Sequence, residues 1–130
     1  MRNIQKNRYR IEFVFEKVAK TILWEYISTF AGLSEWFADQ AVSNGKIYTF
    51  TWSKSSADAE VKAISQGNYI RFHWIDDENP DSYFELRLQK NELTGDVVLE
   101  ITDFAESYDK ASSVNLWENQ VKTLRRVLGL

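Results

Sequence analysis

The chain has 130 residues, a length that fits one domain, and we expect residues 1–130 to fold as a single unit. It contains no cysteine and one histidine, which excludes a disulfide framework, a thiolate metal site and a histidine-rich metal cluster. Sixteen basic and nineteen acidic residues give a net charge of −3, so a nucleic-acid-binding surface is not favoured. We expect no cofactor and no bound metal.

The N-terminal segment carries no targeting signal that we recognise. Residues 1–10 are rich in basic and polar side chains, and no apolar run follows them that matches the core of a signal peptide. No stretch approaches the roughly 18 consecutive apolar residues of a membrane span. We therefore expect a cytoplasmic protein without a membrane span.

The first third of the chain predicts one strand and two short helices. Apolar residues alternate with mostly charged ones from Tyr9 to Phe15, the period of a strand with one buried face. The spacing then becomes helical, with an apolar stripe made of Val18, Ile22, Leu23, Tyr26, Ile27 and Phe30. Gly32 is the expected break, and a second short helix is expected to begin near Ser34.

The residues after Asp39 predict an antiparallel meander. Apolar alternation indicates strands over residues 47–52, 60–63, 69–74, 83–88 and 97–102, and turn-forming residues separate them at 43–45, 66–68, 77–81 and 93–95. For the hairpin around 77–81, we expect Arg71 opposite Glu85 and Tyr69 opposite Arg87, because a shift by two residues would place Arg71 against Arg87.

The C-terminal residues predict a long amphipathic helix. Its apolar positions are spaced by three and four residues, and they are Val114, Trp117, Val121, Leu124 and Leu128, with Leu116 and Val127 widening the stripe. Ser112 or Ser113 is expected to cap its start and Gly129 to close its end. Such a helix is roughly 25 Å long.

The order of these elements predicts an α+β fold in which a curved antiparallel sheet wraps around the C-terminal helix. Several segments then match a known pattern: Thr29 to Phe37, Gly45 before the 48–52 strand, Val61 to Gly67, Phe72 to Trp74, Thr102 to Phe104, and Trp117 ahead of Leu124 and Leu128. In their order and spacing they resemble the START-like (SRPBCC) superfamily, in particular the group similar to the Hsp90 ATPase activator homologue. The resemblance implies a helix-grip fold of about six or seven strands, with two short helices between the first two.

The resemblance also implies an apolar cavity between the C-terminal helix and the sheet. Its expected lining is Phe13, Trp36, Phe37, Tyr48, Phe50, Trp52, Phe72, Leu86, Leu99, Ile101, Val114, Trp117, Val121 and Leu124. The alternative is that these large side chains fill the space and leave a solid core. If a ligand binds there, Tyr48 or Trp52 is expected to supply a polar contact.

Few residues point to catalysis. His73 falls on the polar face of its strand and is expected to face away from the cavity, without a nucleophile beside it. The acidic run from Asp76 to Asp81 lacks the glycine and distal glutamate of a calcium loop and is interpreted as a solvated turn. Asp103 and Glu106, near the mouth end of the last strand, are the candidate carboxylate bases.

Three functions remain open after this reading. The leading hypothesis is non-enzymatic binding of a hydrophobic small molecule or lipid. The alternative is a protein-interaction module resembling the C-terminal domain of the Hsp90 activator, which an exposed apolar patch would favour. The third is a small cyclase- or aromatase-like enzyme, which a buried carboxyl group of raised pKa inside the cavity would favour. We expect a monomer or a weak homodimer.

Overall fold

The computed structural model describes residues 6–130, and within this range one antiparallel sheet of seven strands carries three helices. The elements in chain order are β1 (Lys6–Phe15), α1 (Lys20–Ser28), α2 (Phe30–Leu33), β2 (Gln40–Ser43), β3 (Ile47–Trp52), β4 (Ser55–Ser65), β5 (Tyr69–Trp74), β6 (Phe84–Lys90), β7 (Val97–Glu106) and α3 (Lys110–Val127). This order confirms the predicted α+β helix-grip fold.

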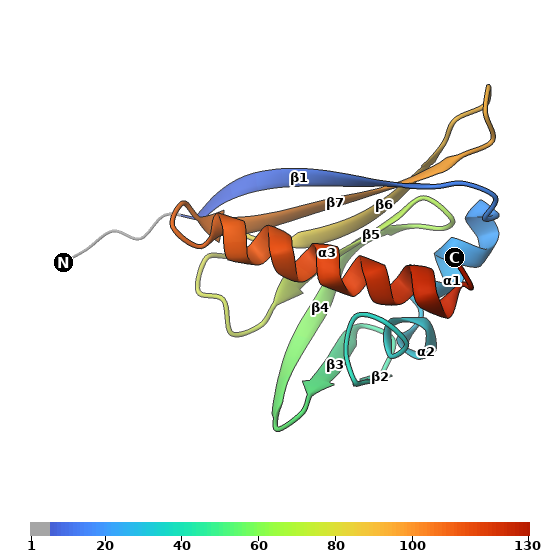
Figure 1. The fold of residues 1–130 in the computed structure, drawn as a ribbon. Helices are drawn as coiled ribbons and strands as arrows, with labels where there is room; N and C mark the ends of the chain where they lie inside the picture. Colours follow the sequence, from blue (N-terminus) through green and yellow to red (C-terminus); the bar gives the residue numbers. More distant parts are fainter. Residues whose placement is uncertain (1–5) are drawn as a thin grey trace.

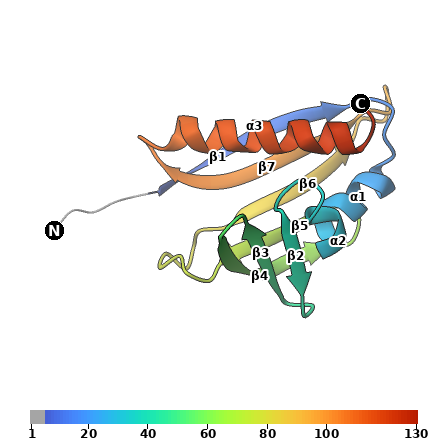
Figure 2. The same ribbon diagram turned by 60° about the horizontal axis from the view of Figure 1, so that its bottom comes forward.

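The sheet begins and ends with strands from opposite ends of the chain. Its order is β1-β7-β6-β5-β4-β3-β2, so the first strand pairs with the last and the others follow as a meander. The β5–β6 register places Arg71 opposite Glu85 and Tyr69 opposite Arg87, as the charge argument predicts. Figures 1 and 2 show α3 lying across one face of the sheet, with α1 and α2 beside its C-terminal end.

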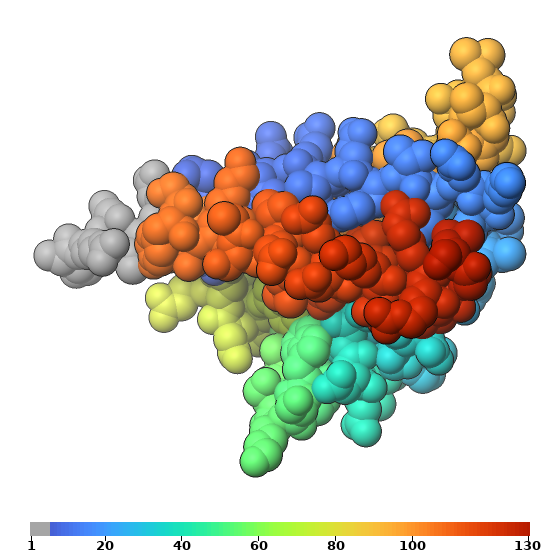
Figure 3. All heavy atoms as spheres, in the orientation of Figure 1, coloured from blue at the N-terminus to red at the C-terminus, as the bar shows by residue number. Residues whose placement is uncertain are grey.

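The core lies between α3 and the concave face of the sheet. Every second residue of a strand points to this face, and the fully buried side chains include Phe15, Phe50, Phe72, Phe84, Leu86, Leu99 and Ile101. The matching residues of α3 are Trp117, Val121 and Leu124, all buried as the helical spacing predicts. Figure 3 shows α3 covering the middle of this face, while the end of the β3–β4 hairpin projects beyond it.

The predicted boundary between the first two helices is wrong. α1 ends at Ser28, and the hydroxyl of Thr29 caps α2 by accepting a hydrogen bond from the Gly32 amide at 2.9 Å. Gly32 therefore lies inside α2, where a side chain would collide with the α1 backbone, and Ser34 ends α2 rather than starting it. The boundary between the helices lies at Thr29 rather than at Gly32, because the Thr29 hydroxyl accepts a hydrogen bond from an otherwise free amide of α2.

The face of α1 and the start of α3 also differ from the predictions. Ile22 and Phe30 are about half exposed, and Trp24 is buried instead. α3 begins at Lys110, after Asp109, so the two serines predicted as caps lie inside its first turn. Its end is as predicted: Gly129 has a positive φ, and the amides of residues 129 and 130 donate to carbonyls of the last turn.

Two further segments were not predicted as strand. β2 has only four residues, of which Ala41 alone is buried. The first half of β4 has a polar sequence, and it is extended because residues 55–60 pair with the whole of β3. Within residues 6–130, none of the helices is sufficiently long and apolar to traverse a bilayer.

Candidate functional site

The interior under α3 is plugged by Phe37, which lies in the segment between α2 and β2. Its ring centroid is within 6.4 Å of six other aromatic rings, the nearest being Phe50 at 4.8 Å. The carbonyl of Phe37 accepts hydrogen bonds from Trp52 Nε1 and Gln120 Nε2, each at 2.8 Å. These two bonds tie the segment to β3 and to α3, so Phe37 is held in place from both sides.

Half of the predicted cavity residues form a close-packed core. Seven of them are at most 1% exposed, and they are Phe50, Phe72, Leu86, Leu99, Ile101, Val121 and Leu124. Phe13 and Val114 are partly buried against this core. Around these residues the structure matches the solid-core alternative.

Open space remains beside Phe37, where α3 faces the ends of β3, β4 and β5. This groove has a volume of about 410 Å³, in the range of small-molecule sites. Its lining is Phe37, Trp52, Ser55, Trp74, Asp103, Ser113, Leu116, Trp117 and Gln120, and we call it the aromatic groove. A second hollow of about 400 Å³ shares four of these residues and adds Trp36.

The structure thus brings together three of the predicted lining residues, Phe37, Trp52 and Trp117, at the aromatic groove. Tyr48 and Trp52 were expected to supply polar contacts to a ligand, but both donate their hydrogen bonds within the protein. The Tyr48 hydroxyl donates to the Ser28 carbonyl at 2.7 Å, and the Trp52 indole N–H donates to the Phe37 carbonyl. The polar side chains that line the aromatic groove are instead Ser55, Asp103, Ser113 and Gln120.

Sequence reasoning missed several lining residues. Trp74 follows the same alternation as Phe72, so its inward orientation was available from the strand pattern. Ser113 and Gln120 lie one turn from Trp117 along the helix, but their polarity gave no sign of a half-buried position. Ser55 could not be found, because the beginning of β4 has no apolar alternation.

Asp103 is the polar centre of the aromatic groove. Its Oδ2 accepts a hydrogen bond from Trp117 Nε1 at 2.8 Å, and its Oδ1 accepts one from the Phe104 amide at 2.7 Å. Burial raises the pKa of Asp103, although the bond from Trp117 opposes the shift. The carboxyl group expected near the mouth therefore lies inside the site, and its proton is held more firmly than in water.

Tyr9 and Ser113 complete the polar cluster beneath the start of α3. Tyr9 faces Asp103 in the β1–β7 register, and its hydroxyl is hydrogen-bonded to the Ser113 hydroxyl. Burial raises the pKa of Tyr9 to about 12, and the nearby Asp103 charge adds to the effect. Tyr9 is thus a neutral phenol at physiological pH and links β1 to α3.

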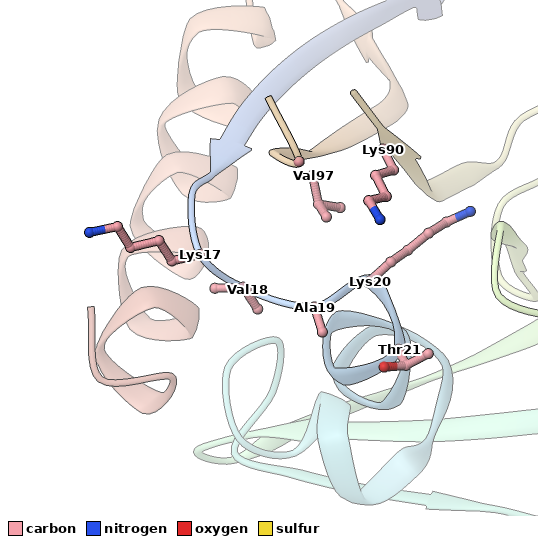
Figure 4. Close-up of a pocket in the computed structure, with 8 residues that line it drawn as sticks. Lys17, Val18, Ala19, Lys20, Thr21, Lys90 and Val97 are labelled. Carbon is pink, nitrogen blue, oxygen red and sulfur yellow. The ribbon is translucent and has the colours of Figure 1, made fainter. Parts of the chain in front are cut away.

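Other candidates lie away from the aromatic groove. His73 shares the outer face of β5 with Arg71, and its Nδ1 is 2.8 Å from the Ser82 carbonyl. A third hollow of about 430 Å³ is lined by Lys17, Lys20 and Lys90 at the start of α1, but Lys17 and Lys20 point in opposite directions away from it (Figure 4). Lys20 is also hydrogen-bonded to Asn68. In residues 6–130, no cluster of three metal-ligating side chains is found.

Comparisons with known proteins agree with this architecture. A protein from Bacteroides fragilis, BfR322, is 45% identical, with a TM-score of 0.69 over 98% of this chain and 94% of that chain. The Aha1 dimer from Colwellia psychrerythraea shares the fold at 15% identity, with a TM-score of 0.69 over 93% of each chain. DynU16, from the dynemicin biosynthetic locus, has a TM-score of 0.77 at 16% identity, over 94% of this chain and 47% of that chain.

A search of curated proteins found no significant match. The sequence profile of the START-like superfamily domain, in contrast, matches residues 3–130, nearly the whole chain. This match confirms the resemblance read from the order of the segments. The chain belongs to the START-like superfamily.

Proposed function

We propose that the protein binds a small, largely apolar molecule in the aromatic groove, without changing it chemically. The observation that carries this proposal is the groove itself, an opening of about 410 Å³ walled by Phe37, Trp52, Trp74 and Trp117 beside an otherwise filled core. Aromatic walls with a few polar groups at fixed positions are typical of small-molecule sites. Burial of apolar area at about 25 cal/mol per Å² would drive binding.

The size of the opening favours a compact ligand over a long lipid chain. The deeper space under α3 is occupied by Phe37 and the residues around it, so an acyl chain would have to displace buried side chains. A planar ring can instead pack against the open sides of Trp52 and Trp74 without such a rearrangement, because both indoles are only partly buried. We therefore place the ligand among ring-containing small molecules.

Binding of Nile red, a neutral planar dye that brightens in apolar surroundings, tests the proposal. We expect saturable 1:1 binding to the wild-type protein and its loss in Ser55→Trp, because Ser55 lines the groove and an indole there would fill it. Ser56→Trp is the matched control, since residue 56 is the next residue of the same strand and points to the opposite face of the sheet. Equal binding by both variants, or none by the wild type, would overturn the proposal.

A second function has one specific observation in its favour. Asp103 is a carboxyl group of raised pKa inside the groove, which is the feature expected of a cyclase-like enzyme that transfers a proton. In that case Asp103→Asn would abolish turnover of a bound substrate while leaving Nile red binding intact. Both functions use the aromatic groove, and they differ only in whether the bound molecule is released chemically unchanged.

A further inference from the structure

We propose that the ligand of the aromatic groove is an organic cation, an amine or ammonium group attached to an apolar ring. This inference rests on the proposed binding function and names the chemical class of the ligand. It predicts that the charged nitrogen lies between the Asp103 carboxylate and the indole faces of Trp52 and Trp74. Three features of the groove carry the inference.

The first feature is a carboxylate without an ion-pair partner. Burial raises the pKa of Asp103 and the charge of Lys6 opposes that shift, but the Lys6 ammonium is itself paired with Asp77 at 3.2 Å. Among residues 6–130 six ion pairs are formed, and Asp103 takes part in none of them. Its two oxygens accept one protein hydrogen bond each, from Trp117 and Phe104, which leaves each oxygen able to accept another. A carboxylate taken out of water is costly unless a positive charge faces it. A cationic ligand would supply that charge.

The second feature is the arrangement of the rings around the opening. The Trp52 and Trp74 rings lie 6.1 Å apart at 58°, and Phe37 closes the corner with its centroid 5.5 Å from Trp52. The two indoles come from β3 and β5, the strands on either side of β4, and both line the aromatic groove. The negative face of an indole attracts an ammonium group within about 6 Å, and tryptophan is the strongest partner of this kind.

The third feature is how the protein's own cations are used. Arg71, Arg87, Lys110 and Arg125 each lie over an aromatic ring elsewhere in the structure, at 4.0 to 5.9 Å from its centroid. None of the four rings lines the aromatic groove, and the nearest of them is Tyr9, the partner of Asp103 across the β1–β7 pair. No lysine or arginine of the described chain lines that groove. Its rings and its carboxylate are therefore open to a cation from outside, while an anionic ligand such as a fatty acid would be repelled by Asp103.

Displacement of Nile red by two soluble probes tests the inference. Benzylamine is a cation at pH 7, and benzyl alcohol is a neutral molecule of nearly the same size. We expect benzylamine to displace the dye at a concentration about tenfold lower than benzyl alcohol does. This ratio is the affinity gain expected from one cation–π contact together with a charge-assisted hydrogen bond. In Asp103→Asn this advantage should fall to about threefold or less, because the rings alone would then attract the charge.

Asp109→Asn is the matched control, since it removes the same charge at an exposed site just before α3 and should keep the tenfold advantage. A far-UV circular dichroism spectrum equal to that of the wild type shows that Asp103→Asn is folded. If both probes displace the dye equally from the wild type, or if Asp103→Asn keeps the full advantage, the cation inference is overturned and the binding function stands. If Nile red does not bind at all, the proposed function fails and the inference fails with it.

Discussion

The hydrogen bond from Trp117 to Asp103 fastens α3 to β7 at the aromatic groove, and Trp117→Phe removes its donor. The replacement ring keeps most of the packing against Phe37 and Phe84, so the loss falls mainly on the 2.8 Å bond to the carboxylate. A hydrogen bond to a charged group is worth about 1.5–3 kcal/mol, and one to a neutral group about 0.5–1.5 kcal/mol. We expect Trp117→Phe to lower the free energy of unfolding by about 2–4 kcal/mol at pH 7, including the smaller ring.

A double-mutant cycle separates the charge from the packing. In the Asp103→Asn background the acceptor is a neutral amide oxygen, so Trp117→Phe should cost about 1 kcal/mol less than in the wild type. Urea denaturation followed by far-UV circular dichroism gives all four free energies. Equal costs in the two backgrounds, within about 0.3 kcal/mol, would refute a bond to an ionised Asp103.

The pH dependence provides an independent check on the same bond. Because burial raises the pKa of Asp103, the folded protein holds this proton more tightly than the unfolded chain does. Stability therefore falls as the pH rises from the pKa of the unfolded chain through the pKa of the folded protein. Loss of the Trp117 donor raises the pKa of Asp103 further and makes the total fall in stability larger. Trp117→Phe should therefore cost more at pH 7.5 than at pH 4, and a cost that does not change with pH would contradict the assignment.

Three further predictions follow from individual side chains. Gly32→Ala should destabilise the fold by at least about 1–3 kcal/mol in urea denaturation, because the new Cβ would lie 2.2 Å from the Glu25 carbonyl oxygen; a neutral effect would show that α1 and α2 separate easily. The pKa of Tyr9 is raised from 10.0 to about 12 by burial, so thermal melts should show stability falling between these pH values, and Tyr9→Phe should remove that part of the fall. Burial would raise the pKa of Glu85, but bonds from two arginines lower it. Its contribution is therefore present above pH 4.5 and lost in acid, and Glu85→Gln should cost more stability at pH 7 than at pH 3.

Much of the fold could be predicted because apolar residues recur at the period of each element. Alternation places Phe50, Phe72 and Leu99 inside, and the three-and-four spacing places Trp117 and Leu124 on the buried side of α3, all as observed. The pattern fails where pairing rather than burial decides the structure. The polar start of β4 is a strand because it pairs with β3. The local sequence around Ser55 and Ser56 does not indicate this pairing.

The candidate site was less predictable than the fold. Helical spacing predicts that Phe37 and Trp117 lie on buried faces. Whether their side chains enclose a cavity or fill it depends on the path of the segment between α2 and β2, and no periodicity in the sequence defines that path. Asp103 was recognised as a carboxyl group near the mouth from its place after a strand. Its hydrogen bond to Trp117 joins residues from different elements, which only the assembled structure reveals.

The indole N–H signals of the five tryptophans report directly on binding in the aromatic groove. In a ¹H–¹⁵N NMR titration with benzylamine or benzyl alcohol, we expect shifts for Trp52, Trp74 and Trp117, which line the aromatic groove. Trp24 should not move, because its indole donates to Gln66 at 3.1 Å, outside the groove lining. Unchanged signals for the three groove indoles, or an equal shift of Trp24, would contradict binding in the aromatic groove.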